Sequence, residues 1–293
     1  MCIIIWEIES VCQVFIGIIY SPAVSGKGAV RMVREAKNII ITGASSGIGT
    51  ELAKMAASKG DYPILLARSY SKLKDLQTQL LQQYSCYSAI YQVDVADEGK
   101  VAAVVNEIEQ HFHRIDVVIN NAGVGTFATV ENIRSEDARA MVDVNILGTF
   151  YITQAVLPHM KKQHAGHIIN IGSQAGRLAT PKSSMYAAAK HALIGFSNAV
   201  RLESSAFSIH VSTVNPGPVR TPFIKKADPS GNYEKAVEKF FIEPSKLAER
   251  ILGLIEHPRR ELNLPWWMAA VSKIYAIMPT ILEKLAGKQF KKK

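Results

Sequence analysis

The stretch from Asn38 to Gly49 reads NIIITGASSGIG, an apolar run that leads into three glycines. The isoleucines predict a short buried strand, and Leu52, Met55 and Ala56 recur after it at helical spacing. Glycines between a strand and a helix let the backbone approach a pyrophosphate, and the helix N-terminus presents free N–H groups to it. This context favours a dinucleotide-binding turn over a stray glycine-rich turn.

The rest of the chain repeats this alternation of strand and helix. Apolar strand-like runs alternate with helical patterns from Asn38 to about Val214, and 293 residues suffice for a substantial core. The sequence therefore predicts a single α/β domain, a Rossmann-type doubly wound parallel sheet flanked by helices. We place the catalytic domain at residues 32–257, between an N-terminal extension (1–31) and a basic amphipathic C-terminal extension (258–293).

The net charge of +9 is concentrated near the C-terminus. Residues 258–293 carry eight Lys or Arg and two Glu, a net charge of +6. We therefore expect no nucleic-acid binding by the body of the protein, and the basic tail is the feature to explain. The three cysteines and eight histidines show no disulfide or metal-ligand spacing. We expect a cytoplasmic protein without a metal site.

The N-terminal extension is apolar but suits neither a signal peptide nor a membrane span. No positive charge precedes the first isoleucines, and Glu7 and Glu9 interrupt the apolar run that ends near Tyr20. A weak membrane anchor and an extension without a role both remain open, and we favour the second. We expect the native start to be Met32.

Three further strand ends carry polar residues suited to a nucleotide. A predicted strand over 62–68 ends in Arg68, where NAD-specific folds place a carboxylate. An arginine suits a 2′-phosphate, or is a surface residue at a helix start. Asp94 and Val95 follow the next strand, and Asp94 either contacts the adenine or caps the following helix. After a strand over 115–119, Asn121, Ala122 and Gly123 line the crevice or form a simple turn.

The stretch SMYAAAK places Tyr186 and Lys190 four residues apart on a predicted helix, so the two side chains share one face. A free phenol has a pKa near ~10, and a cation about 4 Å away favours the phenolate. The pair is therefore a candidate for general acid–base catalysis. A half-buried tyrosine beside a solvated lysine is the alternative.

Two further polar residues, one in a predicted helix and one after a predicted strand, are candidates for the site, and a loop after the last predicted strand adds to it. Asn145 interrupts an apolar helical stretch, so its amide must find partners, and backbone groups would suffice. Ser173 follows a strand over 167–172. Beyond a strand over 209–214 lies the loop 215–221, then a segment with aromatic residues that resembles a lid and favours an apolar substrate.

In this order and at these spacings, the motifs resemble those of the classical short-chain dehydrogenase/reductase family, from Asn38 to about Ile255. The pair Ala67-Arg68 resembles the NADP-preferring members. The resemblance implies a set of NADP(H)-binding residues. These are Gly43, Ser45, Ser46, Gly47, Ile48, Gly49, Arg68, Asp94, Val95, Asn121, Ala122, Gly123, Tyr186, Lys190, Pro216, Gly217, Val219 and Thr221.

The resemblance also implies a catalytic tetrad that interconverts a carbonyl and an alcohol. Tyr186 would exchange a proton with the substrate oxygen, and Ser173 would hold that oxygen. Lys190 would lower the pKa of the tyrosine and bind the nicotinamide ribose. Asn145 would kink its helix and hold a water that relays protons to the lysine. The family further implies a homodimer or homotetramer. A non-catalytic NADP-binding sensor and a membrane-surface scaffold are the competing interpretations, but sensors typically lack the tyrosine or the lysine.

The C-terminal extension contains an apolar stripe at helical spacing. Its members are Trp266, Trp267, Ala270, Ile274, Ile277, Met278, Ile281, Leu282 and Leu285. With the terminal lysines, this stripe suits peripheral contact with an anionic membrane. Packing over the substrate pocket or at a subunit interface is the alternative, which we favour slightly.

Overall fold

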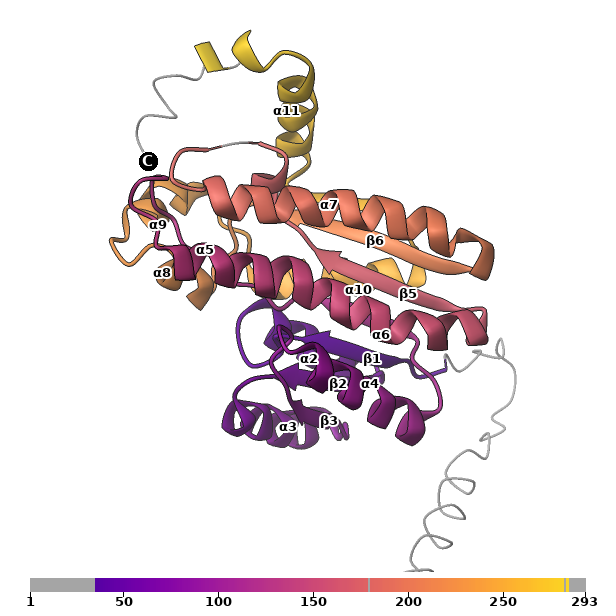
Figure 1. The fold of residues 1–293 in the computed structure, drawn as a ribbon. Helices are drawn as coiled ribbons and strands as arrows, with labels where there is room; N and C mark the ends of the chain where they lie inside the picture. The colour runs from indigo at the N-terminus through magenta and orange to yellow at the C-terminus, as the bar shows by residue number, and fades with distance from the viewer. Residues whose placement is uncertain (1–34, 179, 282, 285–293) are drawn as a thin grey trace, which may run out of the picture. The chain divides into compact units, whose positions relative to one another are not determined.

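The computed structural model describes residues 35–178, 180–281 and 283–284 (Figure 1). The predicted extension 1–31, the proposed start at Met32, and Leu282 and Leu285 of the apolar stripe lie outside the described residues. The predicted α/β class is confirmed, because parallel strands alternate with helices along the chain. The strands are β1 (Asn38–Thr42), β2 (Tyr62–Ala67), β3 (Ala89–Gln92), β4 (Val117–Asn120), β5 (Gly166–Ile171), β6 (Ile209–Pro216) and β7 (Glu261–Leu264).

The helical elements fill the connections between these strands. They are α2 (Ile48–Ser58), α3 (Tyr70–Tyr84), α4 (Glu98–Phe112), α5 (Ser135–Val142), the π-helical turn η1 (Asp143–Leu147), α6 (Gly148–Gln163), η2 (Gln174–Gly176), α7 (Ser184–Ser204), η3 (Ser205–Phe207), α8 (Pro222–Ala227), α9 (Asn232–Val237), η4 (Glu238–Phe240), α10 (Pro244–Glu256) and α11 (Trp266–Ile277).

The strands form one parallel sheet in the order β3-β2-β1-β4-β5-β6-β7. The direction of winding reverses between β1 and β4, which is the topological switch of a doubly wound fold. A crevice for a ligand is expected there, outside the carboxyl ends of the strands. The predicted Rossmann-type sheet is therefore confirmed.

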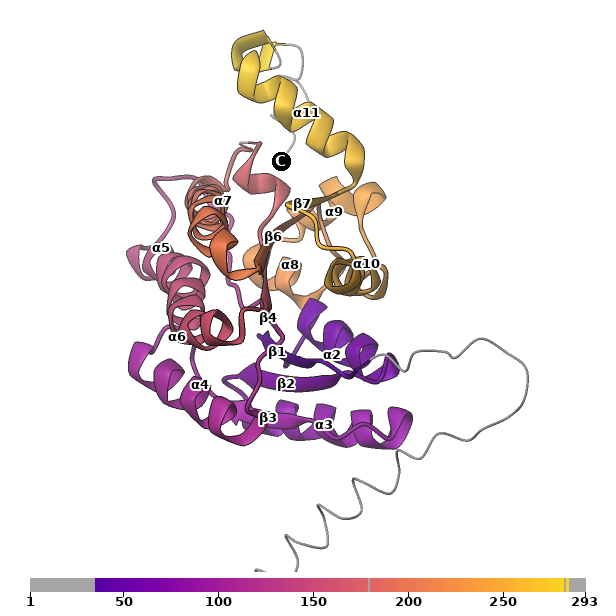
Figure 2. The same cartoon turned by 90° about the vertical axis from the view of Figure 1, so that its right-hand side faces the viewer.

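Both faces of the sheet are buried, which explains why the strand sequences are almost continuously apolar. In β1, Ile39 and Ile41 belong to the apolar core on one face and Ile40 to the core on the other. Helices α2, α3 and α10 pack on the first face, and α4, α6 and α7 pack on the second (Figure 2). The helical stretch Ser135–Gln163 is long and apolar enough to cross a membrane, but Ile152 and Val156 are fully buried against the sheet. We therefore interpret it as a core helix.

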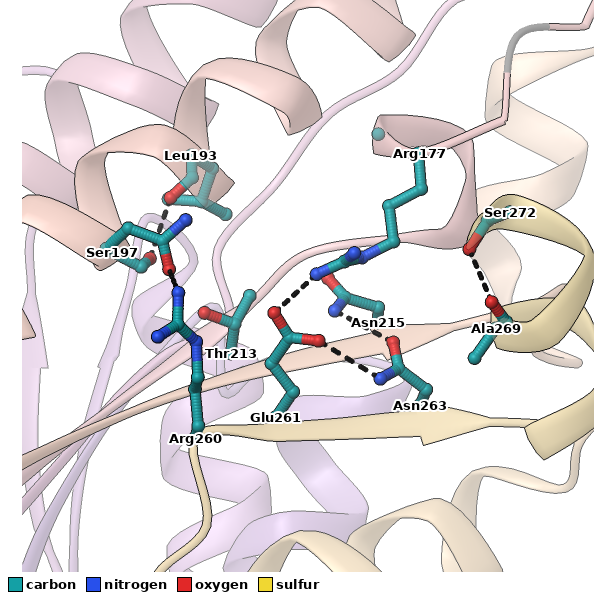
Figure 3. Close-up of polar contacts among 12 residues, drawn as sticks. Arg177, Leu193, Ser197, Thr213, Asn215, Arg260, Glu261, Asn263, Ala269 and Ser272 are labelled. Atoms are coloured by element: carbon teal, nitrogen blue, oxygen red, sulfur yellow. Dashed lines mark hydrogen bonds and ion pairs between the residues drawn. The ribbon is translucent and has the colours of Figure 1, made fainter. Parts of the chain in front are cut away.

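Strand β7 lies beyond residue 257, the predicted end of the catalytic domain. It pairs with β6 from Thr213↔Glu261 to Pro216↔Leu264, so the sheet continues into the segment that was predicted to be an extension. Its sequence, ELNL, alternates polar and apolar residues over too short a run to predict a strand. Its polar residues belong to a network. Figure 3 shows the Arg177 guanidinium paired with Glu261, and Asn263 between Glu261 and Asn215.

We expect His167, on β5, to make the protein sensitive to acid. Its Nε2 lies 2.8 Å from Ser212 Oγ, and burial, followed by the neighbouring His210, lowers its pKa to about 3. The unfolded chain binds this proton below pH ~6.5 and the folded protein does not. Stability should therefore fall as the pH drops from about 6.5 towards 3, by about 2 kcal/mol at pH 5.

Urea unfolding of the wild type and of His167→Gln at pH 7 and pH 5 measures this effect. The substitution costs packing at both pH values, so the difference between the two pH values is the informative quantity. That difference should shrink by about 2 kcal/mol in the variant. An unchanged difference would remove His167 as its source.

Candidate active site

A cavity of about 1600 Å³ opens at the carboxyl ends of the strands, where the winding reverses. Nearly all the residues predicted to bind the cofactor or to react line this one cavity. They are Gly43, Ser45, Ser46, Gly47, Ile48, Arg68, Asp94, Val95, Asn121, Ala122, Gly123, Ser173, Tyr186, Lys190, Pro216, Gly217, Val219 and Thr221. Gly49 and Asn145 do not line it and lie behind its wall.

The glycine-rich turn requires its glycines. Gly43 and Gly47 have φ values of +66° and +58°, a region that side chains other than glycine rarely adopt. A Cβ on Gly49 would lie 2.3 Å from the carbonyl oxygen of Gly43, so the turn could not close. Helix α2 begins directly after Gly47, which provides no side-chain cap. Its first N–H groups are thus suited to a phosphate, as predicted for a dinucleotide turn.

One end of the cavity is basic. The Arg68 guanidinium is 3.9 Å from the Asp94 carboxylate, and 71% of its side chain is exposed. Lys72, in the first turn of α3, also lines this end and was not predicted to do so. A basic residue at the start of the helix after β2 is a signal that sequence inspection could have used. Asp97, and not Asp94, caps α4 by accepting a hydrogen bond from Lys100 N.

Tyr186, Lys190 and Ser173 meet at the other end of the cavity. The Tyr186 hydroxyl is hydrogen-bonded to the Ser173 side chain. Lys190 is buried, and its Nζ donates a hydrogen bond of 2.8 Å to the carbonyl oxygen of Ile171. The same Nζ lies 5.8 Å from the centroid of the Tyr186 ring. The predicted sharing of one helix face is therefore observed.

The pKa values at this end differ from the sequence-based expectation. Burial raises the pKa of the Tyr186 phenol, and the hydrogen bond with Ser173 only partly opposes the rise. Burial also lowers the pKa of Lys190, to about 8. The expected lowering of the phenol pKa by the lysine is therefore wrong for the chain alone, because desolvation is the largest influence on this pKa and only the Ser173 side chain opposes it. Tyr186 is a neutral phenol at neutral pH and carries a proton that it can donate.

Asn145 acts on the loop that follows β4. Its side chain accepts a hydrogen bond from Val124 N and donates one to Val124 O, both at 2.8 Å. It lies in the π-helical turn η1, where the family resemblance predicts a helix kink. The amide is thus satisfied by backbone groups, the alternative considered from the sequence, and it positions the loop beside Lys190. A Cβ on Gly123 would lie 3.7 Å from Lys190 Nζ.

An aromatic cluster surrounds the Tyr186 ring. The rings of Phe127 and Phe223 lie 5.7 and 5.6 Å from it, and Tyr233 lies 4.6 Å from Phe127. Phe223 and Tyr233 belong to the lid-like segment, whose aromatic residues were expected to favour an apolar substrate, whereas Phe127 was not predicted. It belongs to loop sequence without a recognisable motif. The cluster makes this end of the cavity apolar.

Among the described residues, no three metal-ligating side chains gather at one point.

A sequence model of the short chain dehydrogenases matches residues 37–231. The chain belongs to this family. Oxidoreductase BOA17 of Botryotinia fuckeliana is 38% identical over 77% of this chain and 88% of its own length. The uncharacterized oxidoreductase YxnA of Bacillus subtilis is 33% identical over 92% of this chain and 76% of its own length. The predicted membership of the classical short-chain dehydrogenase/reductases is therefore confirmed.

Solved structures of the family share the fold of this short-chain dehydrogenase. An alcohol dehydrogenase from Thermococcus sibiricus, complexed with 5-hydroxy-NADP, superposes with a TM-score of 0.70 at 27% identity, over 78% of this chain and 95% of its own. ElxO with NADP bound gives a TM-score of 0.71 at 28% identity, over 78% of this chain and 97% of its own. These likenesses establish an oxidoreductase of the family.

Proposed function

We propose that this short-chain dehydrogenase interconverts a carbonyl and an alcohol with NADP(H), and that Tyr186, Ser173 and Lys190 act on the substrate and the cofactor. One observation carries the proposal. The hydrogen-bonded hydroxyls of Tyr186 and Ser173 and the buried Lys190 stand in the same cavity as the glycine-rich turn. The NADP-containing relatives described above support the choice of cofactor.

The residues present fit a nicotinamide dinucleotide. The turn that a Cβ on Gly49 would obstruct leaves backbone N–H groups for the phosphates. Arg68 suits a 2′-phosphate, and Lys190 suits the hydroxyls of the nicotinamide ribose. The Asp94 carboxylate suits the adenine amino group. When bound, the nicotinamide donates or accepts the hydride.

The chain's own groups supply the proton and the orientation. In the reducing direction, Tyr186 Oη donates its proton to the carbonyl oxygen, which Ser173 Oγ holds in place. The Lys190 ammonium stabilises the phenolate that is left. In the oxidising direction, the same phenolate accepts the proton of the alcohol. Asn145 acts indirectly, by holding the loop at Val124, and the aromatic cluster excludes water around the reacting oxygen.

A panel of ketones, aldehydes and alcohols tests the proposal, with turnover followed by the absorbance of NADPH. We expect apolar ketones or secondary alcohols to be turned over, since aromatic rings line the reacting end. Tight NADPH binding without turnover of any compound would favour a non-catalytic sensor instead.

We expect NADPH to be preferred over NADH by roughly ten- to a hundredfold, because a charge-assisted contact between an arginine and a phosphate is worth ~1.5–3 kcal/mol. Arg68 is the residue proposed to make this contact. Arg68→Ala should remove most of the preference. The measurement is a fluorescence titration of both proteins with both cofactors. The affinity for NADH is the internal control and should hardly change. Equal affinity of the wild type for the two cofactors would contradict the assignment.

A further inference from the structure

Helix α11 exposes large apolar side chains that the rest of the described chain does not cover. Trp266 is 78% exposed and Ile277 79% exposed, although residues of this kind are usually buried. The other exposed members of this surface, which we call the α11 face, are Trp267, Ile274, Met278 and Ile281. In Figures 1 and 2, α11 extends away from the sheet. Trp266, Ile274 and Ile277 share one face of the helix by their spacing, and an exposed apolar face of this kind marks an interaction site.

The α11 face continues to the mouth of the cavity. Met268 lines the cavity, and a Cβ on Gly217 would lie 3.0 Å from its sulfur. The ring of Trp267 lies 5.8 Å from the ring of Phe240, which also lines the cavity and is 46% exposed. The helix therefore starts at the rim of the substrate end, and its apolar surface is joined to the cavity lining.

The rim of the substrate end is cationic. Four exposed lysines from the lid and the loop before α7 line it; they are Lys182, Lys226, Lys235 and Lys239. Among the described residues that line the cavity, Asp94 is the single carboxylate, and it lies beside Arg68 at the nucleotide end. Lys273 and Lys284 are also exposed, on and just after α11.

We propose that the α11 face docks on an anionic lipid bilayer and opens the cavity mouth towards the lipid. Tryptophans beside basic residues suit the interface between headgroups and acyl chains, and lysines near an anionic surface add to the binding. A second copy of the chain is the less suitable occupant, because it would bring an equally cationic rim against this one. Helix α11, with 12 residues, is too short to cross the hydrocarbon core and lies in the interface.

The docking position implies a class of substrate, and this part rests on the proposed function. A cavity with an aromatic reacting end, a cationic rim and a mouth at the bilayer suits a lipid-like carbonyl compound with an anionic or strongly polar head. Such a compound can pass from the lipid to the Tyr186 hydroxyl without crossing the water.

Sedimentation of the full chain with vesicles tests the docking without any substrate. Vesicles of phosphatidylcholine with phosphatidylglycerol should bind the protein, and raising the salt or using phosphatidylcholine alone should release it. The double variant Trp266→Ser/Ile277→Ser should bind roughly tenfold more weakly or worse. The matched control is Tyr87→Ser. Tyr87 is a similarly exposed aromatic residue, 71% exposed, that lies beside β3 at the opposite edge of the sheet from β7.

Two results would overturn the docking. Unchanged vesicle binding by the double variant would assign the binding to another part of the chain. The second result combines two observations: the wild type does not sediment with vesicles, and the double variant elutes as a smaller species than the wild type in size-exclusion chromatography. Together they would show that a second copy covers the α11 face.

Turnover tests the substrate class separately. With NADPH, the double variant should lose turnover of a long-chain ketone carried in anionic vesicles and keep turnover of dissolved butanone. Equal loss with both ketones would contradict entry from the lipid. No turnover of either ketone by the wild type would count against the proposed function, whereas the sedimentation result would stand.

Discussion

Replacing Tyr186 by Phe is expected to lower turnover by roughly 10²–10⁴-fold, the usual contribution of a general acid or base. The substitution removes only the hydroxyl that is hydrogen-bonded to Ser173 and keeps the ring between Phe127 and Phe223. The cavity should therefore keep its shape, and the affinity for NADPH should stay within about twofold, since no cofactor contact is expected to depend on this hydroxyl alone. Steady-state kinetics on any accepted substrate and a fluorescence titration with NADPH measure both quantities.

The matched control is Tyr233→Phe. Tyr233 is a second phenol in the same cavity, and burial raises its pKa to about 12. It belongs to the aromatic cluster through its contact with Phe127, and the proposed function assigns its hydroxyl no proton transfer. We expect its variant to keep turnover within about tenfold of the wild type, because the ring stays in place. Substantial turnover by Tyr186→Phe, or an equal loss in both variants, would withdraw the assigned role from Tyr186.

Replacing Lys190 by Met is expected to abolish turnover and, at the same time, to stabilise the protein without cofactor. Lys190 is 5% exposed, and burial lowers its pKa to about 8 from an ordinary 10.5. No described carboxylate forms an ion pair with it. At pH 7 the desolvated ammonium of Lys190 therefore lowers the stability of the folded protein. Methionine removes this charge and loses only the hydrogen bond to Ile171 O. We expect a gain of about 1–3 kcal/mol.

The pH dependence separates this explanation from a general improvement in packing. Between pH ~8 and 10.5 the unfolded chain binds the proton and the folded protein does not, so the stability of the wild type should rise with pH over that range. The variant should lack this part of the rise. Urea unfolding at pH 7, 8.5 and 10 tests it. A destabilised variant, or the same change of stability with pH in the two proteins, would show that the buried charge of Lys190 does not destabilise the fold.

The elements that were predictable from the sequence are those in which backbone geometry or an uninterrupted apolar run leaves few alternatives. The run before Gly43 is buried on both sides in β1, and the glycines after it occupy conformations that other residues rarely adopt. Four-residue spacing on a helix placed Tyr186 and Lys190 on one face of α7. Motifs of this kind are local, so short-range rules suffice to recognise them.

The features that were missed depend on contacts between distant parts of the chain. Strand β7 has only two apolar residues and is recognisable through its pairing with β6 and its link from Glu261 to Arg177. Phe127 and Tyr233 come together from a loop and a lid helix. The raised pKa of Tyr186 depends on the amount of protein around the phenol, which spacing alone does not give. Asn145 was singled out as a buried amide, but its partner Val124 is 21 residues away.

The position of β7 also has a consequence for the order in which the protein is completed during synthesis. Gly217, in the loop after β6, donates its N–H to Leu264 O at 2.6 Å, so this loop is anchored by a strand that is synthesised after β1 to β6. A nascent chain that ends before Leu264 has β1 to β6 but lacks the anchor, and it leaves β6 with an unpaired edge. Such a chain is open to pairing with other polypeptides. Closure of this edge is therefore a step that can be completed only after β7 has been translated.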